Sequence, residues 1–374
     1  MRKSLISLAA IGLLATATMT ACDSGSDPSD NGGSTTTGSS GGGTGGTNGI
    51  GVVLPDTTTD RWATADAKYL KSAFDAKKIP SRIVNAEGDR EQFKRLAGEL
   101  LDSGVKVLII ANLDSASGKA VIDDAKAHNV PVIDYDRLTL NGGADYYVSF
   151  DNELVGKLQA QHLKTCLGKK NVENPLVAEL NGSPTDNNAT LFKTGYDSVL
   201  QPLYDSATFT KGPDQWVPDW KEDEAREIFS QMLGQYPNID GVLSANDGIA
   251  NAIIEVLKAK KLNGKVPVTG QDASLDALQH ILMGDQCMTV FKETKLEADA
   301  AAELAIGLYN DVKPQIAGKL KDPESGAYVP FRQVEPKAIT IDNIGDVVAS
   351  GAVDVAELCD GSYAGKCRKA KLID

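Results

Sequence analysis

Histidine and cysteine are scarce in this 374-residue chain. It contains three histidines (His128, His162 and His280) and five cysteines, and no two cysteines have the CxxC spacing. Structural zinc sites are built from Cys and His ligands at short, regular spacing. The sequence therefore argues against a zinc site, and we expect no bound metal.

Motifs of nucleotide-dependent and covalent catalysis are also missing. No apolar run leads into GxGxxG or GxSxG, and the stretch 113–120 has Leu113 and Ala120 where a Walker A loop needs Gly and Ser or Thr. The acidic stretch 322–335 has Gly326 where a calcium loop needs a ligand. Asp and Glu are plentiful, so a carboxylate pair for glycoside hydrolysis stays open as an alternative. We predict that the chain is not an enzyme and needs no cofactor.

Basic residues are outnumbered by acidic ones. The chain has 38 Lys and Arg against 51 Asp and Glu, a formal net charge of -13. Binding to nucleic acid depends on neutralising phosphates with Lys and Arg. Nucleic acid is therefore not an expected partner, and the acidic surface mainly favours solubility.

The N-terminus has the features of an export signal and a tether. Arg2 and Lys3 precede a short apolar run, so residues 1–21 are predicted to be a signal peptide. The run ends in Met19-Thr20-Ala21-Cys22, which resembles a bacterial lipobox with Cys22 as the lipidated residue. Cleavage without lipidation is the alternative. Residues 22–48 are rich in Gly, Ser and Thr and are predicted to form a flexible tether, so we expect an extracytoplasmic protein anchored to the membrane by lipid.

Four cysteines remain in the body of the chain. The short segment between Cys359 and Cys367 favours a disulfide there, which leaves Cys166 and Cys287 as a second pair. Free buried thiols are the alternative for that second pair.

From residue 49 onward, short apolar runs alternate with amphipathic helical stretches. Apolar runs occur at 49–56, 81–87, 105–112, 130–137 and 146–152, and again at 175–183, 240–247, 266–272 and 287–292. Helical spacing of apolar residues separates them, as in 63–78, 89–104 and 225–236. Continuous apolar strands alternating with helices indicate parallel sheets covered on both faces. The predicted fold class is α/β, with two doubly wound parallel-sheet lobes.

Aspartates follow many of the predicted strands. Asp56, Asp136, Asp151, Asp247 and Asp272 each stand at the carboxyl end of an apolar run, where open α/β sheets bind ligands. Asp151 and Asp247 are the best candidates for helix caps or hinge residues. The others predict a polar cleft between the lobes.

The stretch 181–190, NGSPTDNNAT, contains two glycosylation sequons, at Asn181 and Asn188. It also follows an apolar run and precedes a helical pattern. We interpret it as a strand, a turn and a helix capped by Ser183 or Asp186, which places Asn188 in the cleft. The sequons are then accidents of composition.

Several short motifs together resemble the sugar-binding branch of the periplasmic-binding-protein superfamily, which includes binders of xylose and of several monosaccharides. They are DRW (60–62), DYDR (134–137), YVSFDNELVGKLQA (147–160), GSPTDNNATLF (182–192), DQWVPDW (214–220), SAND (244–247), GQDA (270–273) and MTVFK (288–292). The resemblance runs in order from about residue 49 to about residue 350. The tether, the CDGSYAGKC tail and some sequence around 319–331 lie outside it.

The resemblance implies two lobes joined by three crossovers that close on one ligand. The N-terminal lobe would comprise 49–150 plus 293–333, and the C-terminal lobe 151–292 plus 334–374. Such proteins deliver the ligand to the permease and ATPase subunits of an ABC importer, and the resemblance implies a monomer.

The resemblance also implies a set of sugar-contacting residues: Arg61, Trp62, Asp136, Arg137, Asn188, Trp220, Asn246, Asp272 and Lys292. Trp220 is expected to stack on the sugar, with Trp62 as the opposing wall and Trp216 behind. A surface position is the alternative for Arg61, and an interlobe salt bridge is the alternative role of Asp136 and Arg137. Local capping is the alternative role for Asn246 and Asp272, and a hinge contact is the alternative for Lys292. Gln271 and Asn152 are expected to support the site.

The sequence therefore predicts the extracytoplasmic binding component of an ABC importer for a monosaccharide, xylose or a similar aldopyranose. The first alternative is another sugar, such as glucose, galactose or arabinose. An anchored sugar-processing enzyme is a second alternative. A sugar-responsive transcription regulator is disfavoured by the export signal.

Overall fold

This computed structural model describes residues 48–374. The larger of its two main sheets has seven strands. The strand order is β10-β11-β5-β4-β3-β1-β2, and all neighbours are parallel except β10 and β11. The strands are β1 (Ile50–Leu54), β2 (Ser81–Asn85), β3 (Val107–Ile110), β4 (Val132–Tyr135), β5 (Tyr146–Phe150), β10 (Lys319–Lys321) and β11 (Tyr328–Val334). β1, β3, β4 and β5 are fully buried, as continuous apolar strands covered on both faces should be.

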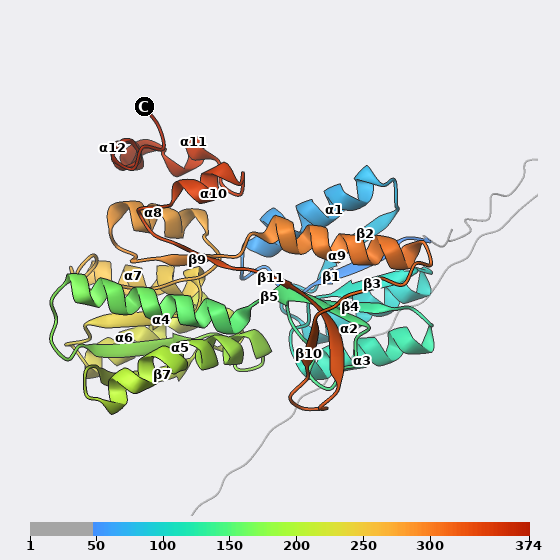
Figure 1. The fold of residues 1–374 in the computed structure, drawn as a ribbon, viewed down its shortest axis with the longest axis horizontal. Helices are drawn as coiled ribbons and strands as arrows, with labels where there is room; N and C mark the ends of the chain where they lie inside the picture. Colours follow the sequence, from blue (N-terminus) through green and yellow to red (C-terminus); the bar gives the residue numbers. More distant parts are fainter. Residues whose placement is uncertain (1–47) are drawn as a thin grey trace, which may run out of the picture. The chain divides into compact units, whose positions relative to one another are not determined.

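Helices cover both faces of this sheet (Figure 1). One apolar cluster joins the sheet to α1 (Ala67–Ala76) and α9 (Thr294–Tyr309), and another joins its opposite face to α2 (Arg90–Asp102) and α3 (Ser115–Ala127). A π-helical turn, Trp62–Asp66, precedes α1 and carries the first predicted site residues. The N-caps Asp89 and Asp114 begin α2 and α3 by accepting backbone N–H groups.

A second, three-stranded sheet has the order β7-β6-β8 and is parallel throughout. Its strands are β6 (Leu176–Asn181), β7 (Thr210–Trp216) and β8 (Gly241–Ser244). One large apolar cluster joins it to α4 (Asn152–Lys169), α5 (Asn187–Asp205), α6 (Glu222–Gln235) and α7 (Asp247–Ala259). Asp151 caps α4 and Asp186 caps α5, so the capping role of Asp151 is confirmed and Asp186 is the cap of α5.

The C-terminal segment forms a smaller layer. β9 (Thr289–Phe291) pairs antiparallel with β12 (Lys337–Ile339). An apolar cluster packs α8 (Leu275–Met283) against α10 (Gly345–Ala349), α11 (Val355–Leu358) and α12 (Ala364–Lys369). The short turn Gly361–Tyr363 leads into α12. The Cys359–Cys367 disulfide is part of this cluster, where both side chains are buried.

The chain passes between the two main sheets at three places in the described residues. β5 leads directly into α4, β9 leads into α9, and β11 leads into β12. The first connection contains one residue and the other two contain two residues each, which limits their conformational freedom. Backbone hydrogen bonding also ties the first and third together, since Asp151 N donates to Val334 O at 3.1 Å.

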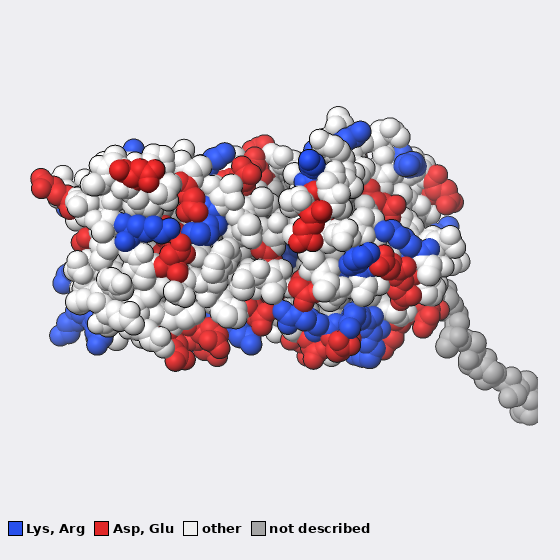
Figure 2. All heavy atoms as spheres, turned by 90° about the horizontal axis from the view of Figure 1, so that it is seen from below, with Lys and Arg blue, Asp and Glu red and all other residues white. Residues whose placement is uncertain are grey.

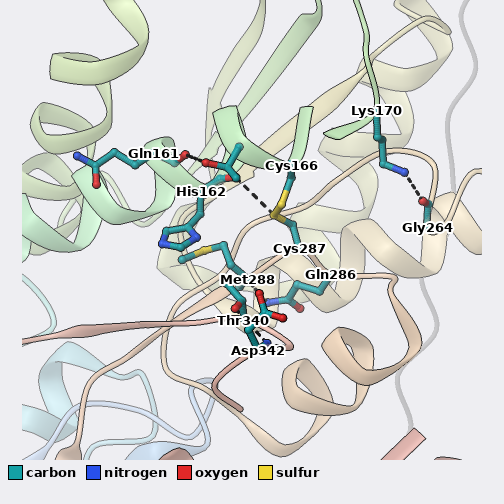
Figure 3. Close-up of a disulfide and its surroundings, with 11 residues drawn as sticks. Gln161, His162, Cys166, Lys170, Gly264, Gln286, Cys287, Met288, Thr340 and Asp342 are labelled. Atoms are coloured by element: carbon teal, nitrogen blue, oxygen red, sulfur yellow. Dashed lines mark hydrogen bonds between the residues drawn. A yellow bond between two sulfur atoms is a disulfide. The ribbon is translucent and has the colours of Figure 1, made fainter. Parts of the chain in front are cut away.

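A second disulfide joins Cys166 to Cys287 (Figure 3). Cys166 lies near the C-terminal end of α4, and Cys287 lies two residues before β9. The bond therefore connects the helix that follows the first crossing to the segment that leads to the second. Both expected cysteine pairs are confirmed.

Three details of the fold differ from the sequence-based expectation. The run 266–272 forms only an isolated bridge between Val242 and Val268, not a strand. β7 was not expected because its sequence, TKGPDQW, is polar and contains Gly and Pro, which an edge strand tolerates. The β10–β11 hairpin extends the first sheet through residues outside the recognised motifs, and it brings antiparallel pairing to a sheet expected to be parallel.

The surface carries charges of both signs. On the face shown in Figure 2, basic and acidic side chains lie beside one another, and neither sign forms an extended field. In the described part of the chain, no helix combines the length and the apolar character needed to cross a bilayer. The predicted signal peptide, Cys22 and the tether before residue 48 lie outside the described residues.

Candidate ligand-binding site

A polar cavity lies where the carboxyl ends of strands from the two main sheets meet. Its volume is about 30 Å³. All nine residues that the sequence proposed for the site line it: Arg61, Trp62, Asp136, Arg137, Asn188, Trp220, Asn246, Asp272 and Lys292. Four more lining residues are Thr59, Asp186, Phe192 and Gln271. The cavity thus brings together side chains from between residues 59 and 292.

Asp136 is the centre of the hydrogen-bond network. It directly follows β4 and is 3% exposed. Its Oδ2 accepts from Arg61 Nη1 at 2.9 Å and from Lys292 Nζ at 2.8 Å, and its Oδ1 accepts from Asn188 Nδ2 at 2.9 Å. Burial opposes ionisation of Asp136, but Lys292 and Arg61 hold its pKa well below the ordinary value. A fixed carboxylate at this point orients donors from both sheets.

Arg61 is held by three carboxylates. Besides Asp136, its guanidinium contacts Asp66 at 2.8 Å and Glu297 at 2.6 Å. Asp66 also accepts from the hydroxyl of Tyr135, which fixes it further. The alternative that Arg61 is a surface arginine is wrong, since it is 8% exposed. A guanidinium clamped on this many sides keeps one orientation toward the cavity.

Asp66 and Glu297 are site residues that the sequence reasoning missed. Glu297 lies on α9 and is fully buried, and burial together with Asp136 raises its pKa well above the ordinary value. It shares a helix face with the buried residues Ala298, Ala301 and Ala305. A carboxylate on the apolar face of an alanine-rich helix was the available signal, since such groups are seldom buried without a partner.

Arg137 forms a second buried ion pair, and its partner lies beside the three-stranded sheet. Its Nε lies 2.9 Å from Oδ2 of Asp186, the cap of α5. Nη1 of Arg137 donates to the Asn112 carbonyl at 3.0 Å, and Nη2 lies 3.5 Å from Asp56. Arg137 thus connects the ends of β3 and β4 to α5.

The two tryptophans of the cavity are arranged differently. The ring of Trp220 packs so closely on Gly182 that a Cβ there would lie 2.0 Å from its Cη2, and its Nε1 donates to Asp186 at 3.2 Å. The ring of Trp62 has the guanidinium carbons of Arg61 and Arg137 over it, at 4.7 and 5.3 Å from the centroid. Both rings add apolar surface to a polar cavity.

Asn246 and Asp272 come from the second sheet. Asn246 Oδ1 caps α7 by accepting from Ile249 N at 2.9 Å, so the capping alternative holds for that atom. Asp272 accepts from the amide of Gln271, and burial raises its pKa to about 6, although Lys292 and Arg61 act in the opposite direction. Asp247 is the residue after the cap, and it accepts from Ser274 N and Thr289 Oγ1.

Three residues that line the cavity have strained backbones. Asp136, Trp220 and Asp272 have φ angles of 61°, 60° and 108°, in the left-handed region that favours glycine. Such strain persists only where surrounding contacts hold it, and it is characteristic of binding and catalytic sites.

The two sequon asparagines are buried. Asn181 is 0% exposed and Asn188 is 2% exposed. Asn188 also accepts from Asn152 Nδ2 at 2.9 Å, so the supporting role expected for Asn152 is seen. Neither side chain has room for an oligosaccharide in this structure.

The arrangement suits binding of a small molecule with several hydroxyl groups. Its cations and carboxylates are paired with one another and offer both donors and acceptors, and aromatic rings form part of the wall. Within residues 48–374, no group of three or more His, Cys, Asp or Glu side chains is placed to hold a metal ion.

Comparison with known proteins agrees with this geometry. The family model described as "Periplasmic binding protein domain" matches residues 50–311. The chain belongs to the periplasmic binding protein family. It is 35% identical over 306 residues to the D-xylose-binding periplasmic protein of Escherichia coli K12, covering 80% of this chain and 88% of that one. It is 33% identical over 324 residues to the multiple sugar-binding periplasmic protein SbpA of Azospirillum brasilense, covering 81% and 88%.

Solved structures of this family share the fold. A carbohydrate transporter solute-binding protein from Chloroflexus aurantiacus, solved in complex with D-glucose, superposes with a TM-score of 0.75 at 28% identity. The match covers 82% of this chain and 97% of that one. These relatives are named as binding proteins, in agreement with the prediction that this periplasmic binding protein is not an enzyme.

Proposed function

We propose that this chain is the extracytoplasmic sugar-binding component of an ABC importer and that its ligand is an aldopyranose, with D-xylose as the first candidate. The ligand binds in the cavity between the two lobes without chemical change. The bound protein then presents the sugar to membrane permease subunits, whose transport is driven by a separate ATPase.

The observation that carries the proposal is the composition of the cavity. Nine side chains expected to contact a sugar line one cavity. Their carboxylate, amide, guanidinium and ammonium groups match hydroxyls that both donate and accept hydrogen bonds, and Trp220 offers an apolar face. The names of the relatives support a sugar ligand, since they include a D-xylose-binding and a multiple sugar-binding protein.

Each lobe of the proposed mechanism contains one of the two main sheets. We assign residues 49–150 plus 293–333 to the N-terminal lobe and 151–292 plus 334–374 to the C-terminal lobe. Lys292 lies at the second crossing and contacts Asp136 of the N-terminal lobe. Closure around a ligand is then a shift between open and closed populations.

We further propose that Cys22 carries the lipid that anchors the protein to the cell membrane and that the monomer is the functional form. Two acyl chains on one cysteine make such anchoring stable. The lipobox-like sequence and the Gly/Ser/Thr-rich stretch that follows it support this part of the proposal.

A thermal-shift screen of aldoses tests the ligand class. A ligand that binds only the folded state raises the melting temperature in proportion to the logarithm of its concentration. We expect a shift with D-xylose or a closely related aldopyranose, and an unchanged sugar in the NMR spectrum after incubation. A sugar that is converted to product would favour the alternative of a sugar-processing enzyme.

A second candidate keeps the fold but changes the sugar. The similar protein from Chloroflexus aurantiacus was solved with D-glucose, and other relatives bind several sugars by name. A pyranose CH₂OH group changes the contact free energy by only about 1–3 kcal/mol, so glucose, galactose and arabinose belong in the same screen.

A further inference from the structure

Arg90 lies outside the cavity and contacts carboxylates of both lobes. It is the first residue of α2. Its Nε donates to Asp114, the cap of α3 in the same lobe. Its Nη2 donates to Oδ1 of Asp219 at 3.2 Å, and Asp219 follows β7 of the other sheet. One contact therefore lies within a lobe, and the other bridges the two lobes.

Asp219 is adjacent to the cavity residue Trp220, and both have unusual backbones. Their φ angles are 50° and 60°, and a left-handed conformation at two consecutive non-glycine residues requires outside contacts to hold it. Asp219 N donates to Ser183 Oγ at 3.2 Å, and Trp220 Nε1 donates to Asp186 at 3.2 Å. The contact with Arg90 is one of several that hold the segment carrying the indole ring, and it is one that comes from the other lobe.

We propose that Arg90 and Asp219 form a latch between the lobes that sets the ligand affinity by holding Trp220 in place in the closed form. The inference rests on the proposed binding function and extends it to two residues outside the cavity. Asp114 holds the Arg90 side chain on its own lobe, so the guanidinium is oriented before closure. Asp219 meets it only when the lobes come together, and the latch therefore stabilises the closed form alone.

The size of the effect follows from the exposure of the pair. The side chains of Arg90 and Asp219 are 39% and 43% exposed, so solvent screens the interaction. We expect removal of the latch to weaken ligand binding about two- to fivefold. The change should appear in the dissociation rate, because the contact is made after encounter. At about 1 M NaCl, where the Debye length is ~3 Å, the difference should vanish.

Dissociation kinetics of the full-length protein test the latch, with D-xylose or the strongest aldose of the screen as the probe. Arg90→Gln and Asp219→Asn should each release the sugar two- to fivefold faster at low salt, by stopped-flow tryptophan fluorescence. The double variant should be no worse than either single variant, because both remove the same contact.

Arg226→Gln is the matched control. Arg226 pairs with Glu255 at 2.6 Å between α6 and α7, and both side chains are exposed, but both belong to one lobe. Its dissociation rate should equal that of the wild type. The latch would be overturned if Arg90→Gln released the sugar at the wild-type rate. It would also be overturned if the effects of the two substitutions on the dissociation rate were additive in the double variant.

A ligand-free measurement separates the latch from the proposed function. Spin labels at Lys77→Cys and Lys260→Cys, both exposed and on different lobes, report the interlobe distance by pulsed EPR. Arg90→Gln should shift the distribution toward longer distances, and an unchanged distribution would contradict the latch. If no aldose binds the wild type, the binding proposal fails while this measurement still decides the latch.

Discussion

The side-chain amide of Asn188 donates hydrogen bonds to two groups of Asp136. Its Nδ2 donates to the backbone carbonyl and to the carboxylate of Asp136, both at 2.9 Å. Asn188 belongs to α5 beside the three-stranded sheet, and Asp136 follows β4 of the seven-stranded sheet. The contact therefore joins the two halves of the cavity at Asp136, which also accepts from Arg61 and Lys292.

Loss of this contact should weaken ligand binding. Hydrogen bonds to charged groups contribute about 1.5–3 kcal/mol, so we expect Asn188→Ala to lower the affinity about 10- to 100-fold. Asn188→Asp should be worse, because two carboxylates would face each other across the lobes. Titration calorimetry with the best aldose of the screen measures both.

Asn187→Ala is the control for this prediction, since it removes the same side chain one residue earlier on α5 and Asn187 does not line the cavity. It should bind the sugar as the wild type does. Equal losses in both variants would show that a general effect on the helix start, not the contact with Asp136, is responsible.

Replacement of Trp220 should abolish binding without unfolding the protein. Trp220→Ala removes the cavity wall that packs on Gly182 and meets Phe192 edge to face at 6.3 Å. We expect an affinity loss of at least about 100-fold, in the range of truncated binding hot spots. Trp216→Ala is the control for this prediction. It removes an equally large ring that packs on the same core but does not line the cavity, so it should leave binding unchanged. Near-native binding by Trp220→Ala would contradict the site.

The pH dependence of binding should report on Asp272. Its pKa is raised to about 6, so the carboxylate is ionised at pH 8 and becomes protonated as the pH falls below 6. If the ionised form accepts from sugar hydroxyls, the affinity should decrease about tenfold per pH unit below pH 6. Asp272→Asn should bind weakly and lack this pH dependence, which calorimetry from pH 8 to pH 5 measures.

The same shift predicts an opposite effect on stability. A carboxyl group with a raised pKa in the folded state destabilises the fold when it is ionised. That cost is fully present above about pH 6 and declines as the pH falls toward the ordinary value near 4. Asp272→Asn should therefore raise the melting temperature of the ligand-free protein by about 2–4 °C at pH 8 and less at pH 4.5. A lower melting temperature at pH 8 would contradict this assignment.

The two disulfides should differ in their contribution to stability. Cys166 and Cys287 are 121 residues apart in sequence, and Cys359 and Cys367 are 8 apart. Loop-closure entropy predicts about 5 kcal/mol for the first and about 2.5 kcal/mol for the second. Denaturant unfolding of the Cys166→Ser/Cys287→Ser and Cys359→Ser/Cys367→Ser proteins should show the larger loss in the former. Equal losses would indicate that local packing, not loop length, sets the contribution.

Much of the fold was predictable because its signals are local. Buried parallel strands are continuous apolar runs, and the polar residues after them mark the ligand-binding edge, as with Asp136 after β4. Asp186 was identifiable as a candidate cap from its position before a helical pattern. The motif order then placed the nine candidate residues, and the structure brings all of them to one cavity.

The parts that were not predicted depend on contacts between distant segments. Asp66 and Glu297 gain their importance only through Arg61, which lies 236 residues from Glu297 in sequence. β7 and β10 are edge strands with polar sequences, and an edge strand needs no continuous apolar run. No sequence pattern marked Arg90 as important, because its partner Asp219 follows a strand of the other sheet.

Calorimetric titration of the wild-type protein with D-xylose tests the central claim most directly. The claim predicts saturable binding of one sugar per chain at micromolar or tighter affinity, with the sugar recovered unchanged. D-Glucose, D-galactose and L-arabinose titrated in parallel rank the candidate ligands. If none of the four sugars gives a heat of binding, and none competes with another for the protein, the account is contradicted.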